Sequence, residues 1–126
     1  QISSETLVID GEIFHLGFLD RNYDKNEMFY PNIIEDGGDM PSVYIKNTHI
    51  KQLTKFYEVI AKKLDIKNGV IKGDLVIHDG QLYIIEFALR LSGGNFSTIC
   101  IPNSSHHDII KYATMIHLNL PIDKIE

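Results

Sequence analysis

The stretch from Lys72 to Asn95, which reads KGDLVIHDGQLYIIEFALRLSGGN, carries one carboxylate on each of two strand-like segments and a cation near each of them. Glu86 stands inside the otherwise apolar run LYIIEFAL. A carboxylate in a buried strand is costly unless a metal ion, a cation or hydrogen bonds compensate it. Asp74 lies on the preceding strand-like segment. Together, Asp74 and Glu86 suit a hard divalent cation, and Mg²⁺ is the best match because it takes a few carboxylates plus phosphate oxygens and water.

The two cations extend this interpretation toward a phosphate ligand. Lys72 precedes Asp74 by two positions, so both share one face of a strand. An ammonium there could neutralise charge on a phosphoryl group in transfer. Arg90 follows Glu86 at a spacing that suits a second contact along a polyphosphate, and Gly93 and Gly94 permit close backbone approach. The alternative is an exposed charged stripe on an amphipathic hairpin, followed by an ordinary glycine turn.

The turn at Asp79-Gly80 decides whether the two carboxylates share a face. A two-residue turn pairs His78 with Gln81 and sends Asp74 and Glu86 to opposite sides of the hairpin. A three-residue loop over 78–80, with Gly80 left-handed as a bulge, pairs residue 77 with Gln81 and keeps both carboxylates on one face. We predict the three-residue loop. With a two-residue turn, no shared metal site is expected.

The remaining elements predict an α+β fold. Asp10-Gly11 separates two β-branched and aromatic runs and predicts a hairpin. Apolar residues at helical spacing predict one amphipathic helix over residues 48–64 and another over residues 105–118, where Ser105 is the expected N-cap. A short helix is expected over 96–101, and residues 20–39 are expected to form a loop. We therefore predict a mainly antiparallel sheet with two principal helices packed on one face.

Composition bounds the class of protein. The chain has 126 residues, is 44% hydrophobic and fits one domain or subdomain. Its net charge of -5 argues against broad nucleic-acid binding, which needs a cationic surface. No apolar run approaches the roughly 18 residues of a membrane span. The lone Cys100 leaves no internal disulfide and fits a reducing compartment, so a cytoplasmic location is predicted.

The Lys72 to Asn95 stretch resembles the carboxylate-bearing core of the ATP-grasp superfamily of ligases. Members carry an acidic residue on one strand, a turn often containing Asp-Gly, and a strand of the Glu-x-Asn-x-Arg type often followed by glycines. The run LVIDGEIFHLGFLDR, preceded by SSE, is similar to a hairpin of the carbamoyl-phosphate-synthetase-like and biotin-carboxylase-like branches. HHDIIKYATMIHLNLPI is similar to their closing helix. The resemblance spans most of the chain, although only the acidic positions and the arginine are specific.

The resemblance implies a role for each matching residue. Asp74 and Glu86 match the Mg²⁺ ligands, and Glu86 also contributes to nucleotide binding. Arg90 matches the arginine that helps to hold phosphate or the acyl-phosphate intermediate. Lys72 stands where some members carry a catalytic arginine, and Glu5 is a further candidate for the nucleotide cleft. The usual asparagine is replaced by Ala88, which cannot ligate a metal. A second Mg²⁺ would then be absent or held by water.

The implied function is ATP- and Mg²⁺-dependent ligation of a small carboxylate to an amine or thiol through an acyl-phosphate. By this resemblance, residues 1–126 form the C-terminal portion of an ATP-grasp domain, without its N-terminal lid and substrate domain. The segment alone is then expected to be inactive. The rival interpretation is a noncatalytic ATP-grasp remnant that serves as a binding or oligomerisation module, and Ala88 favours it. An open sheet edge at Gln1–Ile9 would allow self-association.

Overall fold

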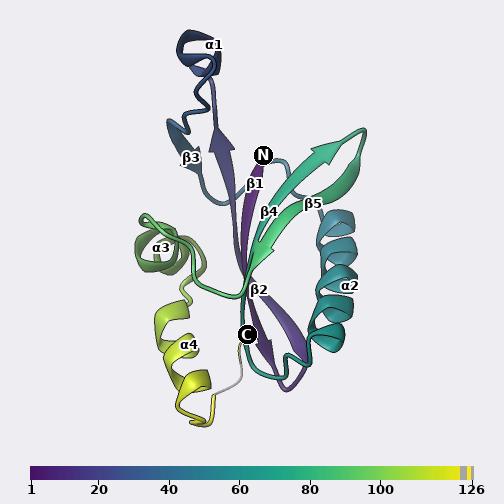
Figure 1. Cartoon of the computed structure of the whole chain (residues 1–126). Coiled ribbons are helices and arrows are strands. Elements are labelled where there is room, and N and C mark those ends of the chain that lie inside the picture. The colour runs from purple at the N-terminus through teal and green to yellow at the C-terminus, as the bar shows by residue number, and fades with distance from the viewer. Residues whose placement is uncertain (123–124, 126) are drawn as a thin grey trace.

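One antiparallel sheet of five strands forms the centre of the molecule, in the order β3-β2-β1-β4-β5. The computed structural model describes residues 1–122 and 125. Helices flank the sheet on its two sides, with α2 on one and η1, α3 and α4 on the other (Figure 1). The strands are β1 (Ile2–Ile9), β2 (Glu12–Asn22), β3 (Gly37–Asp39), β4 (Gly69–His78) and β5 (Gln81–Ala88). This arrangement confirms the predicted α+β class and the antiparallel sheet.

The predicted first hairpin is present, and its second strand is longer than expected. Asp10 and Gly11 have φ angles of 51° and 85°, the left-handed conformation that a two-residue hairpin turn requires. β2 continues past the expected end to Asn22 and pairs with the short β3. The predicted loop over residues 20–39 therefore contains the end of β2, the one-turn helix α1 (Asn26–Phe29) and β3. Figure 1 shows α1 at the far end of this excursion.

The predicted helices are present, with one boundary moved. α2 spans Asn47–Lys63, close to the expected range. The short helix expected after the glycines is a π-helical turn, η1 (Phe96–Cys100), which continues into α3 (Ile101–Ser105). α4 spans Ile109–His117 and begins later than predicted because Ser105 ends α3. Asp108 is the N-cap of α4, and its carboxylate accepts a hydrogen bond from the backbone N–H of Lys111 at 2.9 Å.

The prediction that both principal helices pack on one face is wrong, because the central strand is buried on both sides. Every residue of Ile2–Val8 is buried. On one face, Val8 belongs to a core cluster with Tyr57 of α2. On the other, the neighbouring residue Leu7 belongs to a cluster with Ile109 of α4. Since successive side chains of a strand point to opposite faces, α2 and α4 cover opposite faces of the sheet.

The open edges of the sheet also differ from the prediction. β1 pairs with β2 on one side and with β4 on the other, so residues 2–9 offer no free edge for self-association. β5 and the short β3 are the edge strands. β5 exposes apolar side chains, with Tyr83 51% and Ile85 57% exposed. Among the described residues, no helix is long and apolar enough to cross a membrane.

Candidate functional site

The β4–β5 hairpin brings Asp74 and Glu86 opposite each other by a route that the sequence did not indicate. The predicted three-residue loop is wrong, because His78 pairs with Gln81 across a two-residue turn. The register then shifts, so that Leu75 faces Ile84 while Asp74 faces Glu86. The residue left without a partner is Ile85, and this β-bulge restores the parity that the short turn removes. The two carboxylates therefore share a face.

Lys72 links the two carboxylates. Its ammonium donates a hydrogen bond to Asp74 Oδ2 at 2.5 Å, and its Nζ lies 3.8 Å from Glu86 Oε1. This confirms that Lys72 and Asp74 share a face, as their spacing on β4 predicts. Both side chains are largely buried, with exposed fractions of 10% for Lys72 and 8% for Asp74. A cation thus already lies beside both carboxylates.

Asp74 is held from three directions. Besides Lys72, its Oδ1 accepts a hydrogen bond from the Ser3 hydroxyl at 3.0 Å and lies 3.2 Å from Arg21 Nη1. Burial alone would raise the pKa of the Asp74 carboxyl. The hydrogen bonds from Lys72 and Ser3, with the charges of Lys72 and Arg21, outweigh this effect and lower the pKa below its ordinary value. Asp74 therefore stays ionised at neutral pH.

Glu86 is not the buried charge that its apolar surroundings in the sequence indicate. Its side chain is 63% exposed, because β5 is an edge strand of the sheet. The desolvation cost that singled it out is therefore small in this structure. Glu86 remains a candidate ligand because of its position opposite Asp74 and its distance to Lys72.

Arg21 belongs to the site although the sequence analysis did not select it. It lies near the end of β2, on the face that carries Asp74, and donates to Glu35 from Nε at 2.9 Å and from Nη2 at 2.5 Å. Its guanidinium also lies 5.6 Å from the centre of the Tyr23 ring. The missed signal was the length of β2. The expected strand stopped at Leu19, but its alternation continues and brings Arg21 onto the site face.

A cavity of about 540 Å³ adjoins this cluster and is rich in cations. Among the described residues that line it, Glu35 is the only carboxylate, against the cationic side chains of Arg21, Lys72 and Arg90. The backbone of the glycine segment 92–95 forms another wall. We call this space the cationic cavity, and its lining residues are Ser3, Leu19, Arg21, Glu35, Gly37, Gly38, Lys72, Arg90, Ser92, Gly93, Gly94, Asn95, Phe96 and Cys100. A cationic surface on a chain of net charge -5 favours an anionic ligand.

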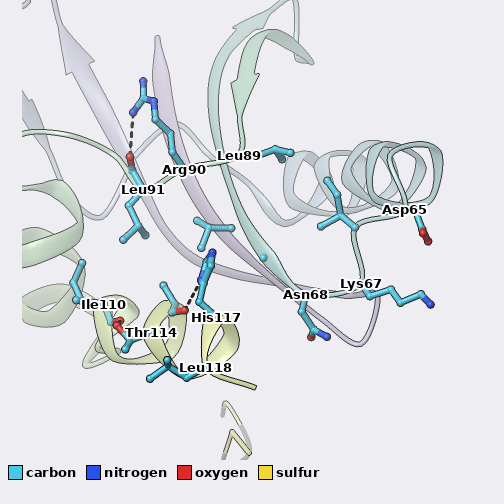
Figure 2. A pocket seen from close by; sticks show the side chains of 14 residues that line it. Asp65, Lys67, Asn68, Leu89, Arg90, Leu91, Ile110, Thr114, His117 and Leu118 are labelled. Atoms are coloured by element: carbon cyan, nitrogen blue, oxygen red, sulfur yellow. Dashed lines mark hydrogen bonds between the residues drawn. The ribbon is translucent and has the colours of Figure 1, made fainter. Parts of the chain in front are cut away.

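Arg90 lies just after β5, where the chain crosses toward η1. Figure 2 shows a larger cavity, about 750 Å³, between this segment, the start of β4 and α4. Arg90 borders both cavities, but its guanidinium reaches away from the α4 residues Thr114 and His117 and donates to the Leu91 carbonyl at 3.0 Å (Figure 2). The larger cavity is lined mainly by apolar groups and contains none of the other predicted site residues.

Glu5 is fully buried and holds the glycine segment against the sheet. Its Oε1 accepts a hydrogen bond from the backbone N–H of Ser92 at 2.5 Å, and its Oε2 accepts one from the Ser97 hydroxyl at 2.7 Å. Burial raises the pKa of the Glu5 carboxyl, against the lowering effect of these hydrogen bonds. Both carboxylate oxygens are thus engaged within the protein. The structure supports a role in positioning the segment, while direct contact with a nucleotide stays a prediction.

The donor set suits Mg²⁺ only with help from a ligand. Within residues 1–122 and 125, no group of three or more His, Cys, Asp or Glu side chains is arranged to hold a metal ion. Asp74 and Glu86 supply two carboxylates, and Mg²⁺ commonly takes its other ligands from phosphate and water. The residue opposite Lys72 is Ala88, which adds no donor. The residues therefore fit a cation that is completed by phosphate oxygens, provided that the Lys72 ammonium makes room.

Comparisons with known proteins find matches at the level of structure. No family model matches the sequence, and no curated protein matches it. An L-amino acid ligase from Bacillus licheniformis superposes with a TM-score of 0.64 at 21% identity, covering 94% of this chain and 28% of that chain. A phosphoribosylamine–glycine ligase from Thermotoga maritima superposes with a TM-score of 0.69 at 20% identity, covering 99% of this chain and 32% of that chain.

Both neighbours are ligases. The chain spans about a third or less of either neighbour, namely 32% and 28%. At these identities the likeness concerns the fold. The chain shares its fold with a part of each of these two ligases.

Proposed function

We propose that this chain is the metal- and phosphate-binding part of an ATP-dependent ligase. The observation that carries the proposal is the contact of Lys72 with both Asp74 and Glu86 beside the cationic cavity. Phosphoryl transfer is promoted chiefly by positioning and by stabilising negative charge, which is the chemistry that cations around a phosphate provide. The fold shared with two ligases supports the same proposal. The branch of the superfamily stays open between carbamoyl-phosphate-synthetase-like and biotin-carboxylase-like enzymes.

The reaction begins with a carboxylate substrate in the cationic cavity. Its oxygen attacks the γ-phosphorus of ATP, the bond from that phosphorus to the bridging oxygen breaks, and ADP leaves. The nitrogen of an amine, or the sulfur of a thiol, then attacks the acyl carbon, the bond from that carbon to the phosphate oxygen breaks, and inorganic phosphate and the proton of the nucleophile leave. Mg²⁺ bound at Asp74 and Glu86 would supply charge neutralisation at the phosphate oxygens. Lys72 and Arg90 hold the transferring phosphoryl group, and Arg21 keeps Asp74 ionised and in place.

The test is Mg²⁺-dependent nucleotide binding by the full-length protein, measured by isothermal titration calorimetry. Glu86→Gln removes the charge of a ligand whose side chain is mostly exposed, so the fold should persist while Mg·ATP affinity falls at least about tenfold. Glu58→Gln on the exposed side of α2 is the matched control and should bind as the wild type does. Absence of nucleotide binding in the wild-type protein would refute the ligase and leave the noncatalytic module. Equal affinity in Glu86→Gln would remove Glu86 from the metal site.

A further inference from the structure

Both carboxylate oxygens of Asp74 already have a partner in this structure. Its Oδ2 accepts from Lys72 at 2.5 Å, and its Oδ1 is shared by the Ser3 hydroxyl at 3.0 Å and Arg21 at 3.2 Å. Glu86, in contrast, is mostly exposed and has Lys72 as its nearby cation, at 3.8 Å. A metal ion bridging the two carboxylates would therefore need the space that the Lys72 ammonium occupies.

We propose that the site loads by cation exchange, in which a divalent metal ion displaces the Lys72 ammonium from Asp74. This inference rests on the proposed function and specifies how its metal site is regulated. Lys72 also lines the cationic cavity, so the displaced ammonium can turn toward an anion bound there without leaving its place on β4. The lysine then pairs with the two carboxylates before the metal ion binds, and with the phosphate afterwards. Lys72 therefore competes with the metal ion for the two carboxylates.

Lys72 is the cation that moves, because Arg21 is tied elsewhere. Two of its guanidinium nitrogens donate to Glu35, at 2.9 and 2.5 Å, and its planar group lies over Tyr23. Releasing Arg21 would break all of these contacts together with the one to Asp74. Lys72 has ion-pair contacts only with the two carboxylates, among the described residues, and both would gain the metal ion in exchange. Its flexible four-carbon stem also needs little rearrangement to redirect the ammonium.

The surroundings of Lys72 limit the positions that its ammonium can take. Its partner on β5 is Ala88, whose methyl group offers no hydrogen-bond acceptor to retain the ammonium. On its other side the partner on β1 is Glu5, whose two oxygens already accept from Ser92 and Ser97. The ammonium therefore has two alternatives, the carboxylate pair and the cationic cavity. An anion in the cavity and a metal ion at the carboxylates should consequently favour each other.

The test is a titration of the full-length protein with Mn²⁺ alone, followed by electron paramagnetic resonance of the free ion. Lys72→Met removes the competing charge and keeps the stem, so the Kd for Mn²⁺ should fall about tenfold, or more, relative to wild type. Lys72→Gln serves as a second neutral variant if the methionine variant does not fold, as judged by circular dichroism. Lys55→Met, on the exposed side of α2, controls for loss of a surface lysine. Glu86→Gln in the Lys72→Met background should abolish the gain.

The outcomes separate the exchange from the proposed function. Tighter Mn²⁺ binding in both neutral variants, lost with Glu86→Gln, supports the exchange. A Kd unchanged or raised in the neutral variants overturns the exchange, while Mg·ATP binding by the wild type would still support the ligase. Absence of Mn²⁺ binding from every variant overturns the exchange, and absence of Mg·ATP binding from the wild type as well overturns both.

Discussion

His15 should make the fold sensitive to acid because its ring is held neutral between two threonines. The Thr54 hydroxyl donates to the Ile50 carbonyl at 2.9 Å, so Thr54 Oγ1 accepts from His15 Nε2 at 3.0 Å. His15 Nδ1, 2.9 Å from Thr6 Oγ1, is then the unprotonated nitrogen. Protonation would place a charge in this interface between the sheet and α2. Burial lowers the pKa of His15 from 6.5 to about 4.

The sign and size of the effect follow from linkage. In the unfolded chain the imidazole takes up a proton below its ordinary pKa of 6.5, whereas in the folded chain it does so only near 4. The contribution of the neutral His15 ring to the free energy of unfolding is therefore fully present above pH 6.5. It is lost as the pH falls toward the folded pKa of about 4. At about 1.4 kcal/mol for each pKa unit, His15 removes about 3 kcal/mol from the free energy of unfolding by about pH 4.

Urea denaturation followed by circular dichroism measures this loss between about pH 7 and about pH 4. Carboxylates also change stability over this range, so the quantity to compare is the difference between wild type and His15→Gln at each pH. Glutamine offers a donor and an acceptor without titrating. The difference should shrink, or reverse, by about 3 kcal/mol on acidification. His78→Gln, which alters an exposed side chain, should follow the wild-type profile. A pH-independent difference between wild type and His15→Gln would refute the assignment.

Two further predictions concern the packing of the sheet. Gly73→Ala should destabilise the fold by about 1–3 kcal/mol in urea denaturation, because the added Cβ would lie 1.9 Å from the Tyr57 hydroxyl. Gly93→Ala, with nothing within 4 Å of the added Cβ, should change stability far less, and equal losses would contradict the steric argument. Glu5→Gln should loosen residues 92–97, because an amide cannot accept at both oxygens. Hydrogen exchange of these backbone amides should accelerate, and unchanged protection would remove Glu5 as their anchor.

Much of the fold was predictable because its local signals agree with one another. The Asp10-Gly11 turn and the apolar period of α2 each indicate one structure. The error in the start of α4 arises because the preceding helix includes the residue that was expected to be the N-cap. Asp108 rather than Ser105 caps α4, since α3 continues to Ser105 before the left-handed His106. The two-sided packing is indicated by the first hairpin, whose residues on both faces include apolar side chains, but this pattern does not say which helix covers which face.

The site was predictable in composition but not in geometry, as the β4–β5 hairpin shows. Asp79 and Gly80 have φ angles of 49° and 74°, the values of a two-residue turn, and that turn alone would separate the carboxylates. Ile85 compensates by bulging on an edge strand, where its exposed side chain and unpaired backbone meet solvent at little cost. Nothing in the run of apolar residues distinguishes Ile85 from its neighbours. Residue types could therefore identify Asp74 and Glu86 as candidates. Whether the two carboxylates share a face depends on the position of the β-bulge, which the sequence does not indicate.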